Sequence, residues 1–224
     1  MSIWVIIIAV MVLSFIIQRV LQSKFKKYSG VPSPGGLSGA EVARLMLERN
    51  GIHNVEVVSI DGKLTDHYNP ADGTINLSHD VYQGRSVAAC AVAAHETGHA
   101  IQHATGYGPL RLRSAMVPMV TFANNTVQWV LLLGVLLINL TPALLYAGIA
   151  LFALTTFFSF VTLPVEIDAS RRAVNWLSAE GVLDAQTRPM AADALKWAAY
   201  TYVIAAIGSL ATLLYYIALA NNRR

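Results

Sequence analysis

Two histidines and a glutamate stand close together in the segment His95-Glu96-Thr97-Gly98-His99. Residues four apart on an α-helix lie on one face, so both imidazoles can reach a single Zn²⁺ at about 2.0–2.1 Å. Glu96 follows the first histidine, where its carboxylate can hydrogen-bond a water on the metal and act as a general base. Zinc lowers the pKa of such a water to about 7, which makes hydroxide available at neutral pH. The segment therefore predicts a hydrolytic site with one Zn²⁺ per chain.

The residues on either side of this segment are almost all apolar, from Val87 to Ala94 before it and Ala100-Ile101 after it. A helix that is apolar nearly all round is buried in a large core or at a membrane. Polar groups buried there need partners, and a metal ion would supply one. Gly98 costs about 1 kcal/mol relative to alanine inside a helix, so we expect it to allow close approach of another backbone.

Two histidines are too few for a hydrolytic zinc site, which usually has three protein ligands and an open position for water. His103 continues the spacing, but eight residues rotate it by about 80° from His95, and it adds no second element to close the site. The metzincin pattern requires a glycine three residues after the second histidine, where this chain has Gln102. We therefore predict that His103 is a polar residue at the end of the helix.

A better third ligand lies further along the chain, just after Pro164, which predicts a helix break. Glu166 is the predicted ligand, because it completes a His₂Glu set. Asp168 is the alternative, but the two carboxylates diverge by about 200° on a helix. We therefore expect Asp168 to hydrogen-bond a ligating imidazole. In the competing interpretation, both acids pair with Arg171 and Arg172.

The chain has 224 residues, a mean hydropathy of +0.50 and only 13% charged residues, whereas a soluble domain carries about 25%. The deficit is concentrated in four apolar runs, each near the roughly 20 residues that a bilayer core requires. We expect a mainly α-helical polytopic membrane protein with a small β-sheet and a small α+β zincin-like metalloprotease domain. The runs cover residues 3–17 with an extension to 21, about 116–138, about 142–163 and about 197–220.

The first run lacks a positively charged start and is followed by Lys24, Lys26 and Lys27 rather than by small residues, so it predicts a retained signal anchor. With four spans, most lysines and arginines lie on the side that holds residues 22–115 and 164–196. The positive-inside rule then predicts a multi-pass protein with its N-terminus outside and its active site on the cytoplasmic side. The arginine pair at the C-terminus opposes this orientation. The basic residues form no stripe with interleaved aromatics, so we expect no nucleic-acid partner.

The soluble part shows signals for a helix and three strands. Ser38 and Glu41 form a capping-box pattern that opens a helix. Strands are predicted over residues 54–60, 63–68 and 74–78, with a tight turn at Asp61-Gly62 after the first. The single cysteine excludes an intramolecular disulfide.

The chain thus divides into six predicted parts. They are an N-terminal transmembrane anchor (1–22), a linker (23–36), a cytosolic zincin-like domain with the HExxH helix (37–115), two transmembrane helices (116–163), a cytosolic helical segment with the third ligand (164–196) and a C-terminal transmembrane helix (197–220).

Four stretches of the chain resemble the YugP-like neutral zinc metallopeptidases, a bacterial family of small membrane proteins. The resemblance extends from about Leu37 to the last span, and it implies a zinc-dependent endopeptidase of the bacterial inner membrane. The stretches are residues 64–70, residues 93–103, Gly106-Tyr107 with Pro109-Leu110, and residues 163–173.

The order of these stretches along the chain is also similar to that in the wider gluzincin class. This class includes membrane proteases of the HtpX and CAAX-processing types. In that class an edge strand precedes the HExxH helix, and a glutamate on a later helix completes the zinc site. The similarity implies His95 and His99 as ligands, Glu96 as the catalytic glutamate and Glu166 as the later glutamate. The chain departs from the CAAX-type pattern at Ser170, where that pattern has an aspartate.

The predicted reaction is hydrolysis of peptide bonds by a zinc-activated water, with Glu96 as general base. Substrates would be membrane or membrane-proximal polypeptides, and the strand over residues 63–69 is a candidate to bind them by β-augmentation, with His67 and Tyr68 near the metal. In the competing interpretation, these two are residues of a hairpin turn. The expected partners are such a polypeptide and the lipid bilayer, and the oligomeric state is left open. The tetrahedral oxyanion needs a donor, and the candidates are His67, Tyr68, Tyr107 and Arg171.

Two other functions are weighed against hydrolysis. In a non-catalytic membrane adaptor the zinc would be structural, with Cys or His in the fourth position; only Cys90 is available, and it lies off the ligand face. A transporter would carry ionisable residues at mid-depth in its spans. The second, third and fourth apolar runs carry none.

Overall fold

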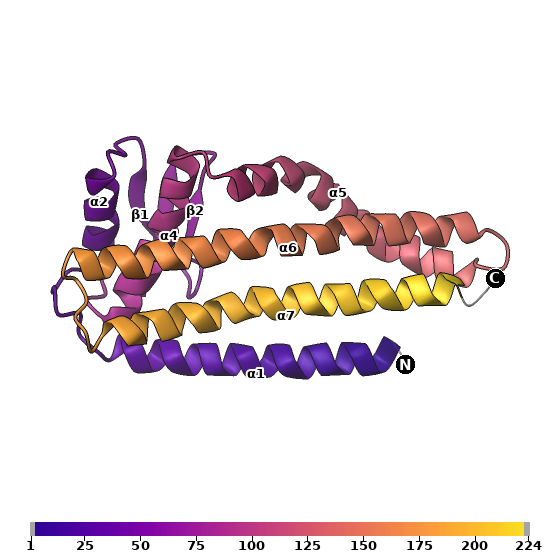
Figure 1. The fold of residues 1–224 in the computed structure, drawn as a ribbon, viewed down its shortest axis with the longest axis horizontal. Helices are drawn as coiled ribbons and strands as arrows, with labels where there is room; N and C mark the ends of the chain where they lie inside the picture. Colours follow the sequence, from indigo (N-terminus) through magenta and orange to yellow (C-terminus); the bar gives the residue numbers. More distant parts are fainter. Residues whose placement is uncertain (1–2, 222–224) are drawn as a thin grey trace. The chain divides into compact units, whose positions relative to one another are not determined.

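The computed structural model describes residues 3–221, most of which are helical (Figure 1). Apolar and helix-forming residues dominate the long helices, while the strands are short and confined to one part of the chain. In order, the elements are α1 (Ile3–Ser29), α2 (Gly39–Arg49), β1 (Glu56–Ile60), β2 (His67–Asn69), β3 (Thr74–Ser78), α3 (His79–Tyr82), α4 (Val87–Ala104), α5 (Gly108–Leu136), α6 (Pro142–Ala179) and α7 (Arg188–Asn221).

The chain forms two compact units. One, called here the span unit, comprises the residues up to 16, residues 111–164 and those from 201 on. The other, called here the site unit, comprises residues 17–110 and 165–200. Helices α1, α5, α6 and α7 contribute residues to both units.

Within residues 3–221, α1, α5, α6 and α7 are each long and apolar enough to cross a membrane. They confirm the prediction of a mainly α-helical polytopic protein with a small sheet. Helix α1 continues to Ser29, so residues 23–29 of the predicted linker are helical. This extension packs against α7, because Lys24 Nζ lies 2.7 Å from Asp193 Oδ2 and the Tyr28 hydroxyl donates to the same oxygen at 2.6 Å.

Helix α6 runs without interruption from Pro142 to Ala179, so the break predicted at Pro164 is wrong. A proline inside a helix removes one backbone hydrogen bond. In membrane-spanning helices neighbouring groups re-satisfy the freed carbonyl, so proline there is tolerated. The acidic residues after Pro164 therefore lie on a direct continuation of the third apolar run.

Helix α2 begins with the predicted capping box. The Ser38 Oγ accepts a hydrogen bond from the Glu41 N–H at 3.3 Å, and Glu41 Oε2 accepts one from the Ser38 N–H at 2.7 Å. These bonds satisfy two donors that a helix N-terminus otherwise leaves unpaired. Helix α2 buries Val42 and Met46 in the core of the site unit.

The three strands form one sheet of order β1-β3-β2, in which β3 is parallel to β1 and antiparallel to β2. Because β3 lies between them, Asp61-Gly62 does not close a hairpin between β1 and β2. Strand β2 is also shorter than predicted, since Leu64 adopts a left-handed backbone conformation with φ 58°. Asp66 then ties the start of β2 to the end of β3, because its Oδ1 accepts from the Ser78 N–H at 2.7 Å.

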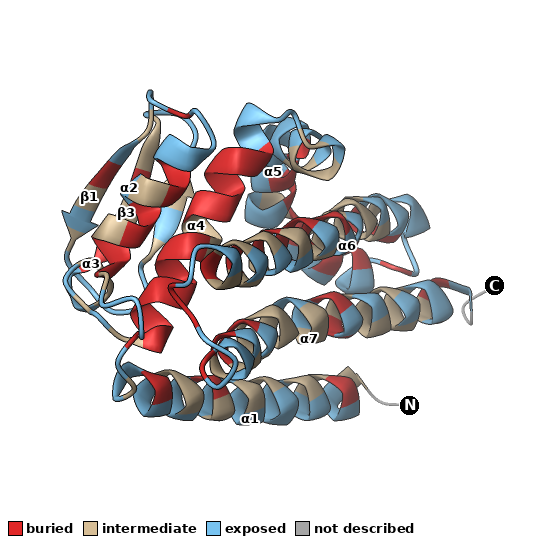
Figure 2. Ribbon diagram, turned by 60° about the vertical axis from the view of Figure 1, so that its left-hand side comes forward, coloured by how far each residue is buried: buried red, intermediate tan, exposed pale blue. Residues whose placement is uncertain are grey.

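Helix α4 is the centre of the site unit and is buried nearly all round (Figure 2). Its N-cap is Ser86, whose Oγ accepts from the Ala89 N–H at 3.2 Å. The apolar flanks of the HExxH segment thus produce the buried helix that their composition predicts. Most of its buried apolar residues, Cys90 included, pack in one cluster with residues of α2, the sheet and the end of α6. Their partners include Val42, Met46, Ile75, Leu77, Ala173 and Leu177.

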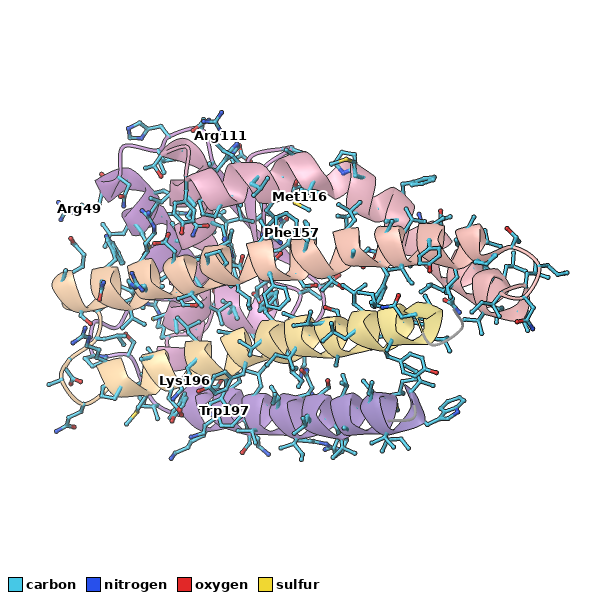
Figure 3. The ribbon with its side chains drawn as sticks, turned by 45° about the vertical axis from the view of Figure 1, so that its right-hand side comes forward. Arg49, Arg111, Met116, Phe157, Lys196 and Trp197 are labelled. Atoms are coloured by element: carbon cyan, nitrogen blue, oxygen red, sulfur yellow. The ribbon has the colours of Figure 1, made fainter. Side chains whose placement is uncertain are left out.

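The span unit has smaller buried clusters. Met116 is buried with Val120 and Val161 of α5 and α6, whereas Phe157 is 54% exposed; Met116 and Phe157 are labelled in Figure 3. Large exposed apolar side chains are the expected surface of helices that face lipid.

Candidate metal centre

The three side chains predicted to bind a metal lie together in the site unit. His95 and His99 project from one face of α4, and their ring centroids are 4.8 Å apart. Glu166 comes from α6, with its Oε2 3.3 Å from His95 Nε2 and 3.6 Å from His99 Nε2. His99 and Glu166 are buried, so the three groups share a site with little access to bulk water.

These separations suit a zinc ion. Two ligands about 2.0–2.2 Å from one ion in a tetrahedral arrangement are about 3.3–3.6 Å from each other. The two nitrogen–oxygen distances to Glu166, 3.3 and 3.6 Å, fall in that range. Two imidazoles and one carboxylate are also a donor set of hydrolytic zinc sites, which leaves one tetrahedral position for water. The residues present therefore fit Zn²⁺.

Close packing of α4 on α6 brings the donors together. A Cβ at Gly98 would lie 2.9 Å from the carbonyl oxygen of Ala169 and 3.2 Å from its Cα. Real Cβ atoms do not approach a backbone this closely, so glycine is required at this position. The close approach expected of Gly98 is thus an approach of α6, the helix that carries Glu166.

The outer nitrogen of each imidazole has a hydrogen-bonding partner. His95 Nδ1 lies 3.1 Å from Ser170 Oγ, and His99 Nδ1 lies 3.0 Å from Gln102 Oε1. Partners of this kind orient ligating imidazoles. Neither residue is predicted from the sequence to be part of the site. A signal does exist for Gln102, because a residue three positions after His99 lies on the same helix face.

Asp168 contacts the site indirectly. Its Oδ2 accepts hydrogen bonds from Gln102 Nε2 at 2.9 Å and from Arg172 Nε at 2.6 Å. The direct bond to an imidazole that the sequence suggests is not formed, because Gln102 lies between Asp168 and His99. The pairing with Arg172 corresponds to the competing interpretation of this acid, while Arg171 is exposed.

Glu96 points from α4 towards the sheet. Its Oε2 accepts a hydrogen bond at 3.1 Å from the backbone N–H of Tyr68, in strand β2. Burial raises the pKa of the Glu96 carboxyl above its ordinary value, against the opposing influence of the His95 and His99 imidazoles. A higher pKa makes this carboxylate a stronger base.

Of the four residues predicted as candidate oxyanion donors, Arg171 is exposed, and the other three occupy different places. The Tyr68 hydroxyl lies 2.7 Å from Nδ1 of His103, so both side chains engage each other near the end of α4. His67 is exposed, and its Nδ1 lies 2.7 Å from the Thr65 carbonyl oxygen. The Tyr107 ring packs under the guanidinium of Arg172, 5.8 Å from centroid to Cζ. Of these residues, Tyr68 is the one whose backbone contacts the predicted catalytic glutamate.

The fold and the site together describe a helical membrane protein with three side chains that could hold a metal ion. Residues 3–221 match the family described as "Putative neutral zinc metallopeptidase", and the chain belongs to this family. The "Putative membrane protease YugP" of Bacillus subtilis (strain 168) is 43% identical over 217 residues, which cover 97% of this chain and 96% of that protein. No solved structure matches the chain. These findings confirm the family resemblance seen in the sequence.

Proposed function

We propose that this protein is a zinc-dependent endopeptidase that hydrolyses peptide bonds of membrane or membrane-proximal polypeptides. The convergence of His95, His99 and Glu166 from two helices, with Glu96 beside them, is the observation that carries the proposal. Zn²⁺ held by these residues would supply a Lewis acid for the scissile carbonyl and lower the pKa of the attacking water.

Glu96 serves as the proton acceptor in this proposal. The Tyr68 N–H holds Glu96 Oε2, which fixes the orientation of the carboxylate. We assign the other carboxylate oxygen to take the proton of the attacking water and to deliver it to the leaving amine. The pKa of Glu96, which burial raises above its ordinary value, favours this cycle, because a carboxylate with a higher pKa is a stronger base.

Strand β2 is the proposed substrate-binding edge. It lies at the edge of the sheet, with β3 on its inner side. The Tyr68 N–H is directed to Glu96 rather than to β3, so this residue presents its backbone to the free edge. An extended polypeptide added there as a further strand would run past the catalytic glutamate. This arrangement supports a polypeptide substrate bound through its main chain.

We also propose that the protein lies in the bacterial inner membrane, with its N-terminus outside and the metal centre on the cytoplasmic side. The support is the excess of lysine and arginine in residues 22–115 and 164–196. Cysteine accessibility to a membrane-impermeant reagent tests this orientation. A cysteine introduced at exposed position Glu48 should react only after the cells are opened.

The peptidase proposal is tested with Glu96→Gln in the purified full-length protein. We expect zinc content to stay at one per chain while hydrolysis of a membrane-protein reporter falls by about 10²–10⁴-fold, the range for loss of a general base. Glu48→Gln is the matched control, because Glu48 is an exposed glutamate of α2. It should retain full activity. Undiminished hydrolysis by the Glu96 variant would refute the proposed role.

A further inference from the structure

Gln102 is a buried polar residue whose amide connects the two helices of the metal centre. Its side chain is fully buried, and it lies on α4 three residues after His99. Its Nε2 donates to the Val165 carbonyl oxygen at 2.8 Å and to Asp168 Oδ2 at 2.9 Å, and both acceptors belong to α6. Its Oε1 lies 3.0 Å from His99 Nδ1.

These acceptors determine which way the amide faces. A backbone carbonyl and a carboxylate accept hydrogen bonds and donate none, so the group of Gln102 that faces Val165 and Asp168 must be the NH₂. Its two hydrogens serve the two acceptors. The reverse orientation would set the amide oxygen against two other oxygens, which is strongly unfavourable in a buried site.

The amide orientation in turn determines the protonation of His99. An amide oxygen only accepts, so His99 Nδ1 must carry the hydrogen that bonds to Gln102. In a neutral imidazole the lone pair then lies on Nε2, which is the atom that faces Glu166. A metal ligand needs that lone pair. We propose that Gln102 is a positioning residue that selects the metal-binding tautomer of His99 and holds its ring towards α6.

Ser170 beside His95 does not impose the same constraint. A hydroxyl can donate or accept, so the 3.1 Å contact with His95 Nδ1 is compatible with either tautomer. The tautomer of His95 is therefore not determined by its partner, whereas that of His99 is determined by Gln102. Asp168 acts through Gln102, because its carboxylate holds the amide, while Arg172 holds the carboxylate at 2.6 Å.

The inference rests on the metal centre of the proposed function, and its test begins with zinc binding to the full-length wild type. Gln102→Met keeps the length of the side chain and removes the amide. We expect its zinc affinity, measured by competition with a chelator, to fall about 10–100-fold. Proton NMR of the zinc-loaded protein should show a slowly exchanging His99 Nδ1 proton in wild type and lose it in the variant.

Thr97→Val is the matched control. Thr97 is equally buried on the same helix, but its hydroxyl bonds to the Ala93 carbonyl oxygen at 2.7 Å, within α4. This substitution should leave zinc affinity unchanged. Asp168→Ala should weaken zinc binding at least about twofold on its own, and by less than that when Gln102 is already Met, because coupled residues are not additive.

The outcomes separate the two proposals. A wild type that binds no zinc would overturn the proposed function and this inference together. A wild type that binds zinc, with Gln102→Met of equal affinity, would overturn the inference alone. Should Gln102→Met fail to fold, the spectrum of the zinc-loaded wild type still decides: absence of a slowly exchanging His99 Nδ1 proton contradicts the assigned tautomer.

Discussion

The span unit and the site unit share helices but differ sharply in the residues they contain. All 13 acidic residues and all six histidines lie in residues 17–110 and 165–200, the site unit. The segments of the span unit hold no acid and no histidine. Every carboxyl and imidazole side chain therefore lies in one unit, while the other unit suits a medium in which charge is costly.

The two units also bury their side chains differently. In the site unit, one large cluster surrounds α4. In the span unit, Trp4, Phe122 and Trp129 are each more than 60% exposed. Lipid offers no hydrophobic driving force between helices, so spans associate through small residues and close contacts. The hydrophobic effect in water therefore assembles the site unit, whereas packing and hydrogen bonds between helices assemble the span unit.

The largest effect is expected from removing Glu166, the proposed third ligand. Glu166→Ala deletes one of three donors from the site unit, so zinc affinity should fall by more than the 10–100-fold expected for loss of a hydrogen-bonding partner. Thermal unfolding without zinc should change little by comparison. Chelator competition and metal analysis measure the first quantity. Full zinc occupancy in this variant would show that the acidic segment does not reach the metal.

A glycine-to-alanine pair compares the two units directly. A Cβ at Gly98 would meet Ala169 O at 2.9 Å, and one at Gly134 would meet Leu145 Cα at 2.7 Å. Overpacking of this kind costs about 1–3 kcal/mol, offset by about 1 kcal/mol of helix propensity. Both variants should unfold at lower temperature in detergent. Only Gly98→Ala should also lose zinc affinity; equal affinity losses would erase the distinction between the units.

The pH dependence of folding stability should come from the site unit, and Glu41 is one residue that contributes to it. The Ser38 backbone N–H, followed by Arg85, lowers the pKa of Glu41 below its ordinary 4.5. Its contribution is therefore complete above pH 4.5 and is lost as pH falls through the lowered pKa. The Glu41 side chain is 43% exposed, so solvent screens its ion pair, and Glu41→Gln should cost only about 0.2–1 kcal/mol at pH 7 and nothing in strong acid. Thermal midpoints at both pH values measure this, and a pH-independent difference would contradict the assignment.

The smallest expected effect is the change in folding stability when either of two buried threonines is replaced by valine. Thr97 in the site unit donates to Ala93 O at 2.7 Å. Thr156 in the span unit is 3% exposed, and its hydroxyl has no hydrogen-bond partner within residues 3–221. Thr97→Val should lower stability by about 1 kcal/mol, while Thr156→Val should be neutral or stabilising. Thermal unfolding of the two variants provides the measurement, and a reversed order would indicate that Thr156 has a partner outside those residues.

Several features could be predicted from sequence because they depend on neighbours along the chain. The capping box at Ser38 and Glu41 and the four apolar helices follow from local pattern. Helical spacing likewise places His95 and His99 on one face. The sequence could favour Glu166 over Asp168 as the third ligand, but no local pattern could show that Glu166 lies near the two histidines.

The sheet and the proline show where such reasoning fails. The strands near residues 56–60 and 67–69 are adjacent in sequence, but β3 separates them, because strand order depends on packing against α4 rather than on turn residues. At Pro164 the helix continues, because one lost hydrogen bond is a small cost in a long apolar helix that packs against its neighbours.

The sequence by itself determined which reactive groups are available: two imidazoles one helical turn apart, with a glutamate between them. Its hydropathy also determined that the long helices suit a membrane. Only the tertiary structure decided how these groups are joined. The contact of Gly98 with Ala169 brings α6 against α4, and that contact places Glu166, Gln102 and Asp168 in one hydrogen-bonded site. The physical reason is that periodicity specifies which face of a helix a residue occupies, whereas the partner of that face depends on close packing between segments distant in the chain.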